Sequence, residues 1–256
     1  AAANGMEDRV RFARGRVPGV ALDGTFDVII FEDFPGLLLD TPTWQLLREL
    51  ERYAAPGARF LPEGGRISCV PVESPELGER LVPRLEELRE FHLEPSLLRQ
   101  FLANEALRTE VAPRFHLGEP AAGPLFPLFP PPAPDRVGVR DRRILERDAT
   151  VHALVAWFDL RLGAGRLVSN GPEGESQPWG QYAFPVHPSL AVPAGVPLEV
   201  TLEPDEVEDG LPGHWRWSVR AGGEARHGHG LAAQPVGPPD LEVDGGVGGV
   251  NGISDR

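Results

Sequence analysis

The sequence predicts an α/β segment followed by a β-barrel, with a short helical insertion between them. Residues 26–72 carry strand, helix and strand signals in that order, which is typical of the second half of a doubly wound domain. From about Val111 onward, short β patterns alternate with Pro- and Gly-rich turns, as in a barrel or sandwich. The 256 residues are 41% hydrophobic, which is enough for a substantial core.

The strand predicted at residues 26–31 organises the α/β segment. Its continuous apolar run is too short for a helix and predicts a parallel strand covered on both faces. Glu32 follows at the carboxyl end, where open α/β sheets bind ligands, and Asp40 comes just before a helix. In the alternative interpretation, Glu32 is a loop acid and Asp40 is the N-cap of that helix.

The rest of the segment follows from periodicity. Leucines on one face predict a helix from about Thr43 to Tyr53, ended by Pro56-Gly57, and Arg66 to Val72 reads as the next strand. Arg9 to Gly15 also has a strand pattern, with no earlier element to pair with. We therefore expect that further sequence precedes residue 1.

A helical arm is expected at about residues 80–108. Leu81 to Phe91 and Pro95 to Leu107 read as amphipathic helices, and the second carries an apolar stripe of Leu97, Leu98, Phe101 and Leu102. This stripe is either ordinary core packing or an oligomer contact.

The β-rich part has six expected strands: residues 114–117, 143–145, 150–162, 181–186, 198–202 and 215–219. Residues 222–256 are rich in Gly and Pro and predict a disordered tail. The predicted division is therefore an α/β domain at 1–74, a barrel domain at 75–221 and a tail at 222–256.

Charge and cysteine content narrow the function classes. The net charge of −13 argues against nucleic acid or an anionic membrane as the main partner and favours a cationic one. The single cysteine, Cys69, excludes an internal disulfide framework and fits a reducing cytoplasm, and its apolar setting predicts a buried, unreactive thiol. No apolar stretch reaches the length of a membrane span.

Four segments together resemble the protein arginine methyltransferases, over about Met6 to Ala221. Phe26–Glu32, with Gly36 and Asp40 after it, is similar to the double-glutamate loop of that family. The other three are Tyr53–Pro62, similar to a helix exit and the strand after it; Thr150–Asp159, similar to a barrel segment; and Gln177–Gln181, where the family has Thr-His-Trp.

The resemblance implies a fold, a cofactor and a reaction. The fold is a Rossmann-like domain that binds S-adenosylmethionine, joined to a β-barrel that carries a helical dimerisation arm. In the implied reaction, Glu32 and Asp40 grip a guanidinium so that one nitrogen can attack the cofactor's methyl group. Phe34 and Trp179 would bind the substrate, while Val17 and Glu32 would contact the cofactor. The implied protein is a cytoplasmic homodimer acting on an arginine-containing protein or a small guanidine.

Departures from the family pattern leave a second hypothesis open. Asp40 replaces a glutamate, Pro178 stands in place of the histidine, Pro18 stands in place of an acid that contacts adenine, and no GxGxG-like turn follows a strand. The alternative is a catalytically degenerate scaffold or binding protein with the same fold. His214, His227 and His229 could in principle bind a metal, but flanking glycines and the absence of nearby carboxylates favour solvated histidines, so no metal is expected.

Overall fold

The computed structural model describes residues 2–15, 17, 19–20, 22–92, 94–131, 133, 136–174, 178–208 and 211–230. A short 3-10 helix, η1 (Ala2–Asn4), comes first. The predicted strand at Arg9 to Gly15 is wrong, because these residues are exposed and pair with no strand in the described part of the chain. Pro18 lies outside the described residues, as do Gln177 and the final part of the predicted tail from residue 231.

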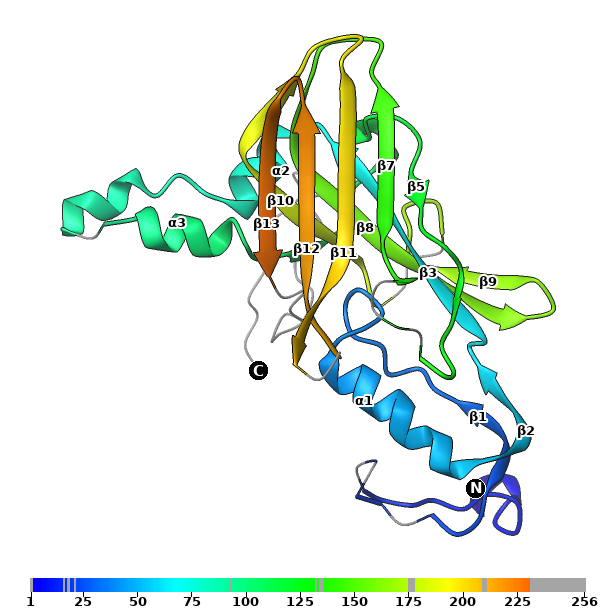
Figure 1. The fold of residues 1–256 in the computed structure, drawn as a ribbon. Helices are drawn as coiled ribbons and strands as arrows, with labels where there is room; N and C mark the ends of the chain where they lie inside the picture. Colours follow the sequence, from blue (N-terminus) through cyan, green and yellow to red (C-terminus); the bar gives the residue numbers. More distant parts are fainter. Residues whose placement is uncertain are drawn as a thin grey trace, which may run out of the picture.

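The α/β segment is built on two parallel strands, β1 (Phe26–Ile30) and β2 (Ala54–Leu61). Between them lie α1 (Thr41–Leu50) and a 3-10 turn, η2 (Glu51–Tyr53), beside the N-terminus in Figure 1. The predicted parallel pairing of the organising strand is confirmed. Its predicted burial on both faces is wrong, because Ile30 is 74% exposed and only Ile29 is buried. The sheet has two strands among the described residues, and only the face with Ile29 packs, against Tyr53 and Phe60.

The next strand, β3 (Gly64–Val72), belongs to a different sheet. It pairs antiparallel with the long strand β8 (Ala149–Gly163), so the expectation that Arg66 to Val72 completes the α/β unit is wrong. The third element of that unit is β2, which lies in the segment Tyr53–Pro62 that resembles a helix exit followed by a strand. This seven-stranded sheet also contains β4 (Leu107–Thr109), β5 (Ala121–Ala122), β6 (Phe126–Pro127), β9 (Arg166–Ser169) and β10 (Gln181–Val192). Five of its strands lie side by side in the order β4-β10-β8-β3-β5. In addition, β6 pairs with β3, and β9 pairs with β8.

A four-stranded sheet packs against the larger one to form the β-barrel (Figure 1). Its strands are, in spatial order, β13 (Glu224–Gly230), β12 (Leu211–Ala221), β11 (Pro197–Glu208) and β7 (Val139–Ile144). The core between the sheets includes Trp217, whose Nε1 donates a 2.7 Å hydrogen bond to the carbonyl oxygen of Pro185. Cys69 is buried in the same core, as predicted, and burial raises the pKa of its thiol to about 12.

Two predictions for the β-rich part need correction. Arg114 to Leu117 was expected as a strand but contains a 3-10 turn, η4 (Pro113–Phe115), and His116 makes only an isolated bridge to Val72. Part of the predicted tail is ordered, because Glu224–Gly230 forms β13 on β12. Ladder hydrogen bonds stabilise this strand although its sequence has little apolar periodicity.

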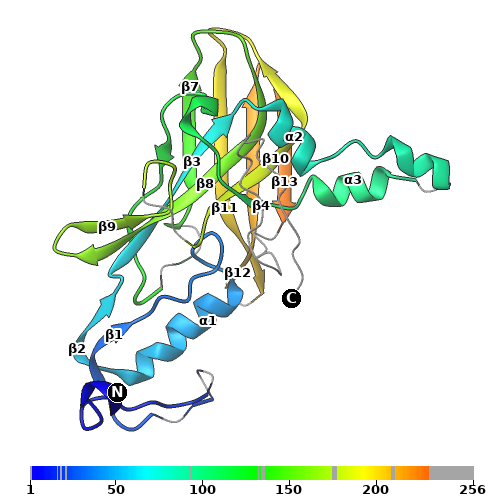
Figure 2. The same cartoon turned by 180° about the vertical axis from the view of Figure 1, so that it is seen from behind.

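The helical insertion projects from the barrel to one side (Figures 1 and 2). It consists of α2 (Pro75–Leu81), a 3-10 helix η3 (Glu86–Phe91) and α3 (Ser96–Leu102), so its α-helices are shorter than predicted. The apolar stripe on α3 does not pack into the core, since Leu97 is 76% and Phe101 60% exposed. Within the described residues, no helix is both long enough and apolar enough to span a bilayer.

Candidate functional site

The loop between β1 and α1 leaves the α/β segment and inserts against the barrel. Every residue from Phe34 to Leu39 is buried, while Glu32 and Asp33 just before them are exposed. Gly36 makes the close approach possible: a Cβ built on it would lie 2.1 Å from the ring of Tyr182 on β10. The barrel therefore fixes this loop, and with it the place where Glu32 leaves the strand.

A chain of aromatic contacts joins this loop to the predicted substrate residue Trp179. Phe34 lies edge-on to Phe31, with ring centroids 4.9 Å apart, and its ring is 6.4 Å from that of Phe158 on β8. Phe158 in turn lies 5.4 Å from the half-buried Trp179 in a T-shaped contact. The structure thus brings Phe34 and Trp179, predicted from distant parts of the sequence, near one phenylalanine ring, that of Phe158.

Side-chain hydrogen bonds hold the segment that carries Trp179. Asn170 accepts a 2.8 Å hydrogen bond from the backbone N–H of Phe158 and donates to the carbonyl oxygen of Gly180. Arg108 donates to the carbonyl oxygen of Pro178. These hydrogen bonds hold the backbone of Pro178 and Gly180, on either side of Trp179, and so fix the position of Trp179 beside β8.

The two predicted clamp acids differ in their surroundings. Asp40 is the N-cap of α1, and its Oδ1 accepts a 2.8 Å hydrogen bond from the Thr43 backbone N–H, as the alternative interpretation expected. Glu32 stands exposed at the carboxyl end of β1, just before the buried loop. One carboxylate therefore has a structural partner, while the other faces solvent. Their joint action on a guanidinium stays a prediction.

Val17, the predicted cofactor contact, lies on the α/β segment away from the aromatic chain. It is half-buried against the small apolar cluster of Ile29, Tyr53 and Phe60. The Tyr53 hydroxyl donates a 2.8 Å hydrogen bond to the carbonyl oxygen of Val20, which holds the segment after Val17 on the same cluster. Val17 thus packs on the β1–β2 strand pair, which Glu32 follows in the sequence, and its role toward a cofactor stays a prediction.

Three residues that position the site were not singled out from the sequence: Phe158, Asn170 and Tyr182. Phe158 and Tyr182 lie in strands whose other core-facing residues are also apolar, so the sequence does not distinguish them from ordinary core residues. Asn170 comes just after β9, where turn residues are common. Only its burial, with 5% exposed, distinguishes it from a turn asparagine.

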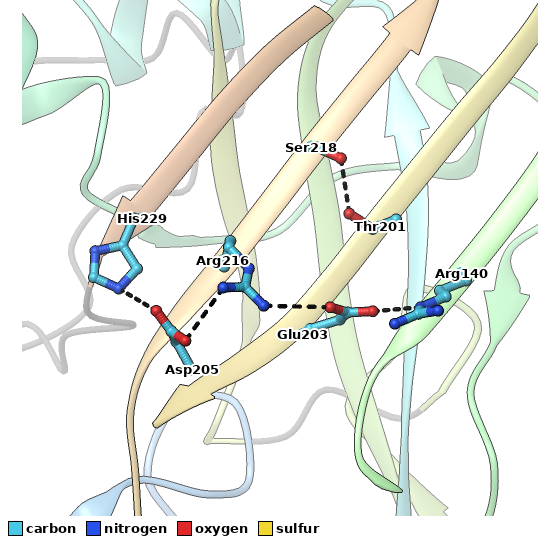
Figure 3. A network of polar contacts seen from close by, with 7 residues as sticks. All are labelled: Arg140, Thr201, Glu203, Asp205, Arg216, Ser218 and His229. Atoms are coloured by element: carbon cyan, nitrogen blue, oxygen red, sulfur yellow. Dashed lines mark hydrogen bonds and ion pairs between the residues drawn. The ribbon is translucent and has the colours of Figure 1, made fainter. Parts of the chain in front are cut away.

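A separate polar network covers the outer face of the four-stranded sheet (Figure 3). Glu203 is hydrogen-bonded to Arg140 and lies 3.7 Å from Arg216, which also approaches Asp205 at 3.3 Å. Asp205 completes the row with a 2.9 Å contact to Nε2 of His229. Alternating charges across neighbouring strands balance one another, and exposed pairs of this kind contribute about 0–1 kcal/mol each.

The three histidines considered above lie on β12 (His214) and β13 (His227 and His229). The rings of His214 and His229 are 4.9 Å apart, and His227 lies two residues before His229. In the part of the chain that the structure describes, no three His, Cys, Asp or Glu side chains are grouped to hold a metal ion.

Comparison with known proteins places the fold. No family model matches the chain, and no curated protein matches its sequence. Among solved structures, a chain of the Trypanosoma brucei PRMT1 enzyme–prozyme heterotetrameric complex with AdoHcy matches with a TM-score of 0.72 at 16% identity, over 90% of this chain and 76% of that one. Arabidopsis thaliana protein arginine methyltransferase 10 matches with a TM-score of 0.65 at 15% identity, over 89% and 77%. The fold is therefore that of the protein arginine methyltransferases, as the sequence resemblance predicted.

At the carboxyl edge of β1, the described residues do not form a complete site for S-adenosylmethionine. In nucleotide-type domains a glycine-rich turn after a strand offers free backbone N–H groups to the ligand. Here the turn after β1 is buried against the barrel, and the adjoining end of α1 is closed by the carboxylate of Asp40. The described part of the chain therefore lacks such a turn at this edge, and the cofactor contacts of Val17 and Glu32 stay predictions.

Proposed function

We propose that this chain is the guanidinium-binding part of an S-adenosylmethionine-dependent methyltransferase of the arginine type. The observation that carries the proposal is the contact chain from Phe34 through Phe158 to Trp179, which joins the loop after Glu32 to the barrel. In this aromatic wall of Phe34, Phe158 and Trp179, the two phenylalanines are buried, so the half-buried Trp179 is the ring that a planar cation would meet. A guanidinium stacks on aromatic faces and pairs with carboxylates, so Trp179 and the exposed Glu32 suit it. The expected substrate is an arginine-containing protein or a small guanidine.

Glu32 has the leading role in this proposal. A guanidinium stays protonated at neutral pH and is a poor nucleophile, so a carboxylate that accepts two of its hydrogen bonds both holds it and orients one nitrogen. S-adenosylmethionine supplies the methyl group in this chemistry. Asp40 has a lesser role, because its Oδ1 already accepts the hydrogen bond that caps α1.

The oligomer belongs to the same proposal. The arm exposes Leu97, Leu98 and Phe101 on one helix, and Phe91 on the preceding 3-10 helix is 71% exposed. Apolar side chains gathered on a projecting element are typical of an interaction surface. We therefore expect a homodimer through this arm, and we place the protein in the cytoplasm on account of its single, buried cysteine.

A second candidate is a non-catalytic partner with the same fold. The capping bond of Asp40 and the incomplete cofactor edge favour it. The Trypanosoma brucei structure is described as a complex of an enzyme with a prozyme, so an assembly of this kind exists for the fold. In this alternative, the chain binds a cationic peptide or a related subunit but does not itself catalyse methyl transfer.

The deciding experiment is substitution of Glu32 by Gln, which removes the charge and nearly preserves the shape. We expect at least about a hundredfold fall in methyl transfer from labelled cofactor to an Arg/Gly-rich peptide or a small guanidine. Asp33→Asn is the matched control, because Asp33 is the neighbouring exposed acid. Wild-type turnover in Glu32→Gln would refute the clamp. Peptide binding that depends on Glu32, without turnover by wild-type protein, would instead favour the non-catalytic partner.

A further inference from the structure

A pocket of about 340 Å³ lies on the barrel beside the segment that carries Trp179. One wall is formed by Glu110–Pro113, directly after β4. The other wall is formed by Asn170–Pro172 and Gly174 at one end of the segment and by Gly180–Gln181 at its other end. This volume falls within the range of small-ligand and side-chain sites, and the site described above does not use the pocket.

The pocket contains a buried amide with unused donors. Gln181 is 4% exposed, and its Oε1 accepts a 3.1 Å hydrogen bond from the Val111 backbone N–H. Across the described residues, no group accepts a hydrogen bond from its Nε2, and this nitrogen is not sealed by protein atoms. An amide nitrogen at the wall of a pocket with two free N–H groups is suited to a carbonyl oxygen from a ligand.

Glu110 gives the rim of the pocket its negative charge, whereas the nearby Arg108 is engaged with the carbonyl oxygen of Pro178 and lies against Gly180. Glu110 is exposed and is the one ionisable side chain among the lining residues of the described chain. The remaining lining is glycine or apolar, apart from Asn170 and Gln181, and Asn170 is engaged with Phe158 and Gly180. A carboxylate on the rim and an amide donor inside match a positively charged side chain carried on a peptide backbone.

We infer that this pocket binds a cationic stretch of the peptide substrate that flanks the target arginine. The inference rests on the proposed function, because it names where the rest of that substrate lies. The pocket lies next to the aromatic wall, because Gly180 lines the pocket and the adjacent residue Trp179 contacts Phe158. A peptide carbonyl bonds to Nε2 of Gln181, and a lysine or arginine two or more residues from the target faces Glu110.

The test is peptide binding measured by fluorescence anisotropy with two labelled peptides. The first has one target arginine and flanking lysines, and the second replaces that arginine by neutral citrulline. Because citrulline is neutral, the second peptide lacks the guanidinium that pairs with Glu32, and the part of its binding that Glu110→Gln removes reports on the pocket. Failure of the proposed function would appear as insensitivity of the first peptide to Glu32→Gln, a separate readout.

Two substitutions address the two contacts. Gln181→Glu keeps the acceptor for Val111 and the side-chain size but replaces the N–H donors, so we expect about tenfold weaker binding of both peptides. Glu110→Gln should weaken both severalfold and flatten the salt dependence, whereas Glu146→Gln, on the exposed turn after β7, should not. Unchanged or tighter binding in Gln181→Glu would overturn the carbonyl contact, and citrulline-peptide binding insensitive to Glu110→Gln would overturn the site.

Discussion

Replacing Phe34 by Ala tests whether the loop after β1 is truly anchored on the barrel. The ring is 2% exposed and lies between Phe31 and Phe158. An aromatic side chain buries about 150–250 Å², which at about 25 cal/mol per Å² corresponds to roughly 4–6 kcal/mol as an upper bound. Partial collapse of the cavity brings the expected loss in free energy of unfolding to about 3–5 kcal/mol.

Chemical denaturation followed by circular dichroism measures this loss. The matched control is Phe91→Ala, the same substitution at a side chain that is 71% exposed, which should change the free energy of unfolding by no more than about 0.5 kcal/mol. A loss below about 1 kcal/mol for Phe34→Ala would refute the reasoning, because the loop would then not depend on its contacts with β8. The proposed position of Glu32 beside the aromatic wall would fail with it.

Three further outcomes are expected. Asp40→Ala should lower the free energy of unfolding by about 1 kcal/mol, through loss of the N-cap bond to Thr43, while Asp40→Asn should keep it; equal losses in a denaturation series would contradict the cap. Burial lowers the pKa of His152, although a backbone hydrogen bond at Thr150 and the charge of Glu73 act to raise it. The folded state therefore binds a proton at His152 less readily than the unfolded state, so the free energy of unfolding should fall as the pH drops below about 6.5. Thermal melts from about pH 7.5 to 5.5 should show a weaker pH dependence for His152→Gln. Phe101→Asp should convert a dimer to monomer in light scattering, and a wild-type protein that is monomeric at tens of micromolar would disprove the arm contact.

Local patterns predicted the elements whose surroundings are simple. The apolar run from Val28 gave the parallel strand β1, and alternating apolar residues gave the long barrel strands such as β8 and β10. Helix α1 followed from its leucine spacing and its cap. In β8, β10 and α1, residues that set the pattern also make the packing contacts, whereas in β1 only Ile29 does.

Pairing between distant strands could not be predicted in this way. The pattern of β3 is the same whether it completes the α/β unit or enters the barrel, and only its ladder with β8 decides. Strand β13 is held by backbone hydrogen bonds to β12, which leave no apolar signal. The candidate site shows the same limit. Trp179 and Phe34 were predicted through the family resemblance, whereas the role of Asn170 could not be predicted, because its hydrogen bond to the carbonyl oxygen of Gly180 exists only in the folded chain.

The pairing of β3 with β8 also bears on the order of folding. Arg66 and Asp159, joined at 2.6 Å across these strands, are 93 residues apart in the sequence, whereas Thr201 and Ser218 in the β11–β12 hairpin are 17 apart. Closing the longer loop costs more chain entropy, so the hairpins of the four-stranded sheet should form early and the β3–β8 ladder late. Since the loop carrying Phe34 packs on β8, the candidate site comes together only in the last steps of folding.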